Sequence, residues 1–186
     1  MLEREHVDPN LPDQDGDGPL SRAGIKGNAG VVKLLLELGD VDPNLQNVNE
    51  QTPLGCAAIE GYEGVVNLLL EWGDVDLNRS DKGGNGPLSC AAVKGHAGVV
   101  KLLLEREDVD PNLQNVNEQP LGGAAITGQE GVVELLLERG NIDPNHPDKY
   151  GQTPLRWAAI YGHESVVKLL LDREMSTPAS QANTVV

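Results

Sequence analysis

Phenylalanine is absent from this chain of 186 residues, and aromatic side chains make up only 3% of it. The core must therefore be built from Leu, Val, Ile and Ala. The two cysteines are too few for a disulfide scaffold. No uninterrupted apolar run approaches the roughly 18 residues that indicate a membrane-spanning helix, and the charged opening MLEREHVDPN lacks the apolar segment of a signal peptide. We therefore expect a soluble protein of a reducing, cytoplasmic compartment.

Basic residues are also scarce. The chain has 14 of them against 29 acidic residues, which gives a formal charge of -15. Proteins that neutralise nucleic-acid phosphates or anionic membrane surfaces carry the opposite balance. The composition therefore argues against nucleic acid and membranes as partners, and solubility is a sufficient explanation of the charge.

What the chain has in abundance is internal repetition. A segment of the form GVVKLLLE recurs at intervals of 33 or 34 residues, beginning at Gly30, Gly64, Gly98, Gly131 and Ser165. A proline opens the apolar segment before each copy, at Pro19, Pro53, Pro87, Pro120 and Pro154. A longer period is also present, because DVDPNLQNVNEQ at 40–51 returns unchanged at 108–119, 68 residues later. Five units therefore fill most of the chain, and the longer period indicates that a block of two units was duplicated.

Within each unit the local signals predict two short helices. In the second unit Thr52 can cap a helix that begins at Pro53 and ends before Gly61. A second helix is expected over about residues 63–71, with an apolar stripe formed by its valines and leucines. The sequence that follows, GDVDLNRSDKGGNG, has the composition of a turn. The stripe is too broad for one pair of helices to cover, so neighbouring units are predicted to stack into a solenoid.

These units resemble the ankyrin repeat. QTPLGCAAIEGYEGVVNLLL at 51–70 and QTPLRWAAIYGHESVVKLLL at 152–171 match its Thr-Pro-Leu opening, its Ala-Ala pair, its glycine break and its Val-Val-x-Leu-Leu-Leu second helix. The resemblance covers about residues 13–174, and the near-identical copies look like the ankyrin arrays of filamentous fungi. It implies an all-α ankyrin-repeat solenoid of about five helix-turn-helix units with β-turn fingers, acting as a non-enzymatic module that binds a protein partner.

The resemblance also divides the chain. It predicts a remnant of a preceding repeat at 1–12, a flexible C-terminal tail at 175–186, and five units between them: 13–46, 47–80, 81–114, 115–147 and 148–174. Only Thr52 and Thr153 keep the capping threonine of the family, and Gly24 replaces the second alanine of the first unit. Glycine in a helix costs roughly 1 kcal/mol relative to alanine. We therefore expect the first repeat to fray most easily.

The stretch DQDGDG at 13–18 alternates carboxylates with small residues, as an EF-hand calcium loop does. The twelfth residue of such a loop is a bidentate acid, but here it is Gly24. The equivalent stretch 68 residues later, DKGGNG, has Gly83 in place of the middle carboxylate. Both stretches fall where the ankyrin family has its finger, and Asp, Asn and Gly favour turns. The sequence therefore predicts a turn and no dedicated metal site, and leaves weak calcium binding open.

No arrangement of a nucleophile and a base stands out, and we expect neither catalytic residues nor a cofactor. Resemblance to the family gives His96 and His163 structural roles at the helix breaks, whereas His146 has no metal-ligand partner at a suitable spacing. Cys56 and Cys90 occupy equivalent positions in adjacent units. Packed helices lie about 8–10 Å apart, whereas a disulfide requires Cα atoms within about 4.4–6.8 Å. Two free thiols are therefore expected.

Helical geometry places an apolar row on the face of the first helices that points away from the second helices. The row is β-branched in every unit: Ile25, Ile59, Val93, Ile126 and Ile160. Either stacked neighbours bury this row as a structural ladder, or it forms the floor of a groove that receives a partner. The residues beside it vary from unit to unit: Lys26, Glu60, Lys94, Thr127 and Tyr161.

Resemblance to the family adds the finger tips to the candidate partner-binding surface. They are Gln14, Asp15, Asp17, Val48, Asn49, Gln51, Lys82, Gly83, Asn85, Val116, Asn117, Gln119, Lys149, Tyr150 and Gln152. Trp157 and Tyr161 make the fifth unit the expected anchor, because aromatic residues are over-represented among binding hot spots. Two alternatives stay open. The apolar ends of the array could stack between chains in a structural or oligomerising role, or the chain could be an engineered binding scaffold.

Overall fold

The computed structural model describes residues 7–113, 119–139 and 141–176, with side chains described as far as residue 172. These ranges contain ten helices and no strand, so the predicted all-α architecture is confirmed. Each of those helices is too short or too polar to cross a lipid bilayer. The five that begin at the recurring proline are α1 (Pro19–Ile25), α3 (Pro53–Glu60), α5 (Pro87–Lys94), α7 (Pro120–Thr127) and α9 (Pro154–Tyr161). The five that follow them are α2 (Ala29–Glu37), α4 (Glu63–Glu71), α6 (Ala97–Leu104), α8 (Glu130–Glu138) and α10 (Glu164–Ser176).

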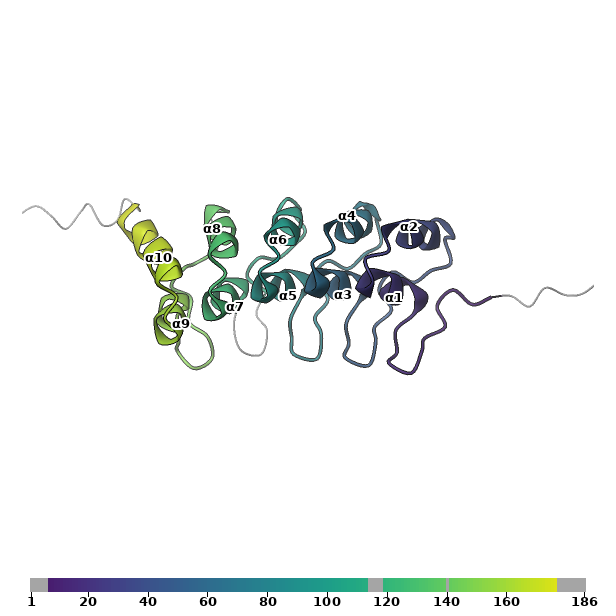
Figure 1. The fold of residues 1–186 in the computed structure, drawn as a ribbon, viewed down its shortest axis with the longest axis horizontal. Helices are drawn as coiled ribbons and strands as arrows, with labels where there is room; N and C mark the ends of the chain where they lie inside the picture. Colours follow the sequence, from purple (N-terminus) through teal and green to yellow (C-terminus); the bar gives the residue numbers. More distant parts are fainter. Residues whose placement is uncertain (1–6, 114–118, 140, 177–186) are drawn as a thin grey trace, which may run out of the picture.

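The helix pairs stack side by side in chain order and form an elongated solenoid (Figure 1). Each odd-numbered helix contacts the next odd-numbered helix, and each even-numbered helix contacts the next even-numbered one. We call the odd-numbered row the inner helices and the even-numbered row the outer helices. Loops that we call fingers project from the side of the inner helices (Figure 1). The predicted stacking of consecutive units is therefore confirmed.

The helix boundaries follow from local chemistry. In the second unit α3 and α4 have the predicted bounds, and Thr52 Oγ1 accepts a hydrogen bond from the Gly55 N–H at 3.1 Å. Gly61 ends α3 with a φ of 78°, in the left-handed region that glycine tolerates best. A Cβ at Gly61 would also lie 2.5 Å from His96 Nδ1. The glycine break therefore serves both the backbone and the packing of the next unit.

The core manages without phenylalanine because the inner helices approach closely. Alanines fill the contact between successive inner helices and are fully buried: Ala57, Ala58, Ala91, Ala92, Ala124 and Ala125. Larger aliphatic residues fill the layer between inner and outer helices, and Leu54, Leu69 and Leu103 are fully buried there. Burying such a side chain contributes about 1.5–3 kcal/mol. One hydrophobic core therefore runs through all five units.

A ladder of asparagines ties the loops of successive units together, and sequence reasoning missed it. Asn44 Nδ2 donates to the Asp74 carbonyl at 2.7 Å, while Asn44 Oδ1 accepts from the Asp76 N–H at 2.8 Å. Asn10 and Asn78 make the same pair of bonds to the next loop, and Asn112 donates to the Asn141 carbonyl. A signal was present, because this asparagine returns in each unit even where the proline before it is replaced by Leu77.

Candidate partner-binding surface

Each described finger is a tight turn held by its first residue. In the first finger the Asp13 carboxylate accepts hydrogen bonds from the N–H groups of Asp15 and Asp17, at 2.9 and 3.1 Å. Asn47, Asp81 and Asp148 accept the two equivalent bonds in their own fingers. The turn geometry predicted for DQDGDG is therefore confirmed, and Asp and Asn serve because their oxygens replace backbone acceptors.

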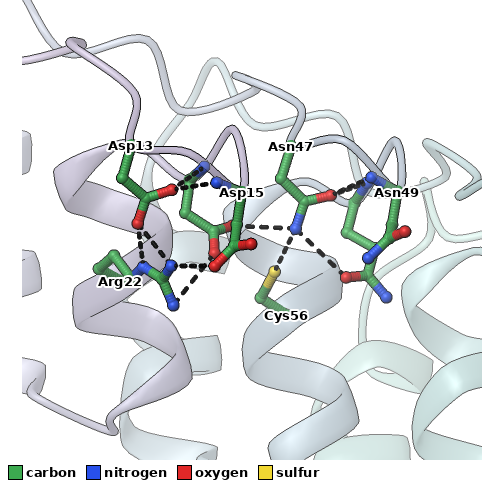
Figure 2. Close-up of polar contacts among 8 residues, drawn as sticks. Asp13, Asp15, Arg22, Asn47, Asn49 and Cys56 are labelled. Carbon is green, nitrogen blue, oxygen red and sulfur yellow. Dashed lines mark hydrogen bonds and ion pairs between the residues drawn. The ribbon is translucent and has the colours of Figure 1, made fainter.

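The three carboxylates of the first finger converge on Arg22 of α1 (Figure 2). Arg22 Nε lies 2.5 Å from Asp13 Oδ2, and its terminal nitrogens lie 2.6 Å from Asp15 Oδ2 and 3.5 Å from Asp17 Oδ2. The guanidinium lowers the pKa of the Asp13 carboxyl below its ordinary value. The three side chains are close enough together to hold a cation, but the cluster already contains the positive charge of Arg22. It is thus a structural feature of the finger.

Neighbouring fingers are joined to one another. The Val48 N–H donates to the Asp15 carbonyl and the Lys82 N–H to the Asn49 carbonyl, both at 3.0 Å. Asn47 Nδ2 also donates to the buried Asp17 carboxylate at 2.9 Å and to Cys56 Sγ at 3.9 Å (Figure 2). The first three fingers therefore form a connected row beside the inner helices.

A hollow of about 290 Å³ lies between this row and the inner helices α3 and α5. Its lining combines polar finger side chains with apolar and basic side chains of the helices: Gln51, Asp81, Asn85, Ile59, Cys90, Val93 and Lys94. Five of these seven residues belong to the surface predicted from sequence. The hollow could accept one aliphatic or aromatic side chain of a partner, with polar groups at its rim to fix orientation.

The apolar row is partly ladder and partly groove floor. Ile25, Ile59, Val93 and Ile126 are half-buried, whereas Ile160 is exposed. Val93 packs closely on the next inner helix, because a Cβ at Gly123 would lie 2.6 Å from Val93 Cγ2. Ile59 and Val93 nevertheless line the hollow. Part of the row is therefore packed on the neighbouring helix and part of it lines the hollow, while binding of a partner there stays a prediction.

The fifth unit carries a set of aromatic contacts. Trp157 and Tyr161 stack with ring centroids 6.0 Å apart, and Lys149 Nζ lies 4.9 Å from the Tyr150 ring centroid. Trp157 is half-buried, and its Nε1–H donates to Asp148 Oδ2 at 3.1 Å. Trp157 therefore helps to hold its own finger, whereas Tyr150 and Tyr161 offer exposed aromatic surface.

The other predicted site residues are mostly accessible. Lys26, Val48, Asn49, Glu60, Lys82, Lys94, Thr127 and Lys149 are exposed, and Gln51, Asn85, Gln119 and Gln152 are half-buried. Thr127 Oγ1 donates to the Gly123 carbonyl at 3.0 Å, so its hydroxyl serves its own helix. Val116 and Asn117 lie outside the described residues. Partner binding by all of these residues stays a prediction.

Charge is distributed unequally between the two sides of the solenoid. The described fingers and inner helices, with Lys26 that ends α1, carry seven acidic and six basic residues. The rest of the described side chains carry 18 acidic and six basic residues. The acidic surplus of the described side chains therefore lies on the outer helices and connecting loops, and the described side chains on the side that bears the hollow are close to neutral in total.

His96, His163 and the two cysteines lie in structural environments. The ring Nε2 atoms of His96 and His163 lie 2.9 Å from the carbonyl oxygens of Ile59 and Ile126, in the preceding unit. Cys56 and Cys90 are buried free thiols, as predicted, and burial raises the pKa of each to about 12. A thiol with such a pKa is a poor nucleophile near neutral pH.

A stack of helix pairs with a row of fingers defines a helical-repeat solenoid. The family model for ankyrin repeats (3 copies) matches residues 1–81, 20–115 and 88–181. The chain therefore belongs to the ankyrin-repeat family, whose members typically act as non-enzymatic modules for protein–protein interaction. A comparison with curated proteins finds none that matches this chain.

Proposed function

We propose that this chain is a non-enzymatic module that binds a partner protein on the side formed by the fingers and inner helices. The observation that carries the proposal is the hollow between α3 and α5, where finger side chains and the apolar row meet. A partner segment would insert an apolar side chain there and make polar contacts with Gln51, Asn85 and Lys94. This arrangement of an apolar centre and a polar rim is typical of protein interfaces.

Two further features of the same side support the proposal. The side that bears the hollow is close to neutral, so a partner need not be strongly basic to approach it. Tyr150 and Tyr161 of the fifth unit supply exposed aromatic surface on the same side, and we propose them as the second contact region, in place of the half-buried Trp157.

We also propose a cytoplasmic location and an origin among the ankyrin arrays of filamentous fungi. The buried, unreactive thiols suit a reducing compartment, and the near-identical units suit such an array.

A peptide selection tests the site even though the natural partner is unidentified. A library of random peptides displayed on phage would be selected against the intact chain, and the peptides obtained would then be tested on single variants. Lys94→Glu at the hollow and Tyr161→Ala in the fifth unit should each cost more than about 1 kcal/mol of binding free energy for part of the peptides. Lys101→Glu, which makes the same charge change on the outer helix α6, is the matched control and should leave binding unchanged.

The opposite pattern would contradict the proposal. If the selected peptides tolerated both Lys94→Glu and Tyr161→Ala but lost affinity for Lys101→Glu, the binding surface would lie on the outer helices. Circular dichroism would confirm that all three variants keep the helical fold, since the three side chains are exposed.

A further inference from the structure

Equivalent side chains of the five units differ in exposure in a way that marks two faces that the other described residues leave uncovered. Val31 of α2 is 47% exposed, whereas its equivalents Val65, Val99, Val132 and Val166 are 0–1% exposed. Val166 belongs to the last pair and is still covered, so this position is covered by the preceding unit. Leu34 of α2 and Leu38, which follows the end of α2, are also exposed. Val31, Leu34 and Leu38 form what we call the leading face.

The opposite pattern occurs in the fifth unit. Leu171 of α10 is 44% exposed, whereas its equivalents Leu36, Leu70, Leu104 and Leu137 are 3–8% exposed. Leu36 belongs to the first pair and is covered, so this position is covered by the following unit. Ala159 and Ile160 of α9 are exposed as well. Together these three residues form what we call the trailing face.

A row of glycines also indicates that the described residues leave the trailing face uncovered. A Cβ at Gly27, Gly61, Gly95 or Gly128 would clash with a side chain of the following unit: Tyr62, His96, Gln129 or His163. A Cβ at Gly162, the fifth member of the row, would meet nothing within 4 Å among the described residues. The residue of the first unit that corresponds to these four covering side chains is Asn28.

We propose that two copies of this chain associate head to tail, with the trailing face of one copy packed on the leading face of the other. The contact of the second unit with the third is the template. The fifth unit repeats the residue types that the second unit presents to its successor: Leu155, Ala159, Ile160, Val167 and Leu171 for Leu54, Ala58, Ile59, Val66 and Leu70. The first unit repeats Val99 and Leu102 of the third as Val31 and Leu34. The contact between the two copies would therefore repeat the interface that the second and third units form within one molecule.

This geometry has two physical consequences. The two faces differ, so the contact is heterologous and leaves a free leading face and a free trailing face after each addition. Association therefore produces open chains of copies. Each copy carries a formal charge of -15, so the copies repel one another at low ionic strength. Added salt screens this repulsion and should strengthen the association.

Complementary variants give a sharp test by sedimentation velocity over a wide series of concentration and salt. Leu34→Glu blocks the leading face and Leu171→Glu blocks the trailing face. The unchanged chain should form species of increasing mass, and each variant alone should sediment as a monomer. An equimolar mixture of the two variants should form a species of twice the monomer mass and nothing larger, because each supplies the face that the other lacks. Asn67→Glu, which adds the same charge on the exposed side of α4, should behave like the unchanged chain.

Three results would overturn the proposal. They are an unchanged chain that stays monomeric at every concentration and salt, a mixture that stays monomeric, or single variants that each still form a dimer. The last result would show pairing of like faces. The substituted leucines are exposed, and matching thermal unfolding curves would confirm that the variants fold.

Discussion

Individual side chains decide the shape of the fingers. The first residue of each described finger is Asp or Asn and accepts two backbone N–H groups, although the other residues differ. The fourth residue adopts a positive φ in each case and is Gly16, Glu50, Gly84 or Gly151. Among the described residues, Glu50 is the only one other than glycine with a positive φ, and its φ is 60°. The second finger therefore carries a local cost that the others avoid.

Replacing Glu50 with glycine should raise stability. The left-handed conformation costs a residue other than glycine roughly 1–2 kcal/mol, and part of this gain is offset because glycine makes the unfolded chain more flexible. We expect Glu50→Gly to increase the free energy of unfolding by up to about 1 kcal/mol, measured by urea titration. Glu60→Gly, near the end of α3, should lower it by about 0.5–1 kcal/mol. An equal loss from both substitutions would contradict this account.

The buried thiols should resist modification in the folded protein. Cys56 and Cys90 have a pKa of about 12, so almost no thiolate is present at pH 8. We expect both thiols to react slowly with a disulfide reagent such as DTNB in native buffer and rapidly after denaturation. The rate should rise with pH up to about the thiol pKa, because the thiolate is the nucleophile. Fast, stoichiometric reaction of the native protein at pH 8 would show that the thiols are accessible.

At the scale of the helix pairs, polar contacts between units supplement the hydrophobic core. The asparagine ladder joins loop to loop, His96 and His163 reach back to the preceding inner helix, and the fingers bond to one another. These contacts join residues about 30 or more positions apart in sequence. They set how one pair sits on the next, whereas the buried alanines and leucines supply most of the favourable free energy.

Removing one rung of the ladder should destabilise the solenoid measurably. Asn78 Nδ2 donates to the Asp108 carbonyl at 2.7 Å, and its Oδ1 accepts from the Asp110 N–H at 2.8 Å. Asn78→Ala should lower the free energy of unfolding by about 1–3 kcal/mol, because two backbone groups lose their partner. The control is Asn67→Ala, which removes one exposed bond to Glu71 within α4 and should cost under about 0.5 kcal/mol. Equal effects of the two substitutions would mean that the ladder adds nothing specific.

At the scale of the whole molecule, stability depends on each unit and on its contacts with its neighbours. The first unit combines three weaknesses: Gly18 supplies no side-chain cap, Gly24 lies within α1, and the leading face has no covering unit among the described residues. The fifth unit has the Thr153 cap and keeps both alanines in α9. The structure therefore gives reasons for the fraying expected from the sequence.

Hydrogen exchange should reveal this gradient. We expect the amides of α1 and α2 to exchange faster than those of α5 and α6, as measured by mass spectrometry of peptic fragments. Gly24→Ala should slow exchange in the first unit, since alanine gains roughly 1 kcal/mol of helix propensity. A Cβ at Gly24 would meet the Pro53 carbonyl oxygen at 3.4 Å and Ala57 Cβ at 4.0 Å, so there is room for it. Equal protection of the first and central units would contradict the prediction.

The helices were predictable because their signals are local. Thr52, Pro53 and Gly61 mark the ends of α3, and the structure has the helix between them. The finger turn of DQDGDG was predictable for the same reason, since Asp13 bonds the N–H groups two and four residues further on. The role of Trp157 was only partly predictable, because its bond to Asp148 depends on how the finger folds back on α9. The sequence predicts Trp157 and Tyr161 as an aromatic anchor, and the structure shows that Trp157 supports the finger of its own unit.

The amino-acid sequence by itself determined that five near-copies form helix pairs and stack in line, since each copy carries an apolar stripe that only its neighbours can cover. The tertiary structure alone decided which polar groups meet: Arg22 among three carboxylates, the asparagines between loops, and the side chains that line the hollow. The physical reason is that each contact requires its atoms to meet within a hydrogen-bond length. The asparagine ladder and the hollow depend on how far one unit is offset from the next, and the contacts of Arg22 depend on how the first finger folds back on α1. Periodic patterns in the sequence specify neither.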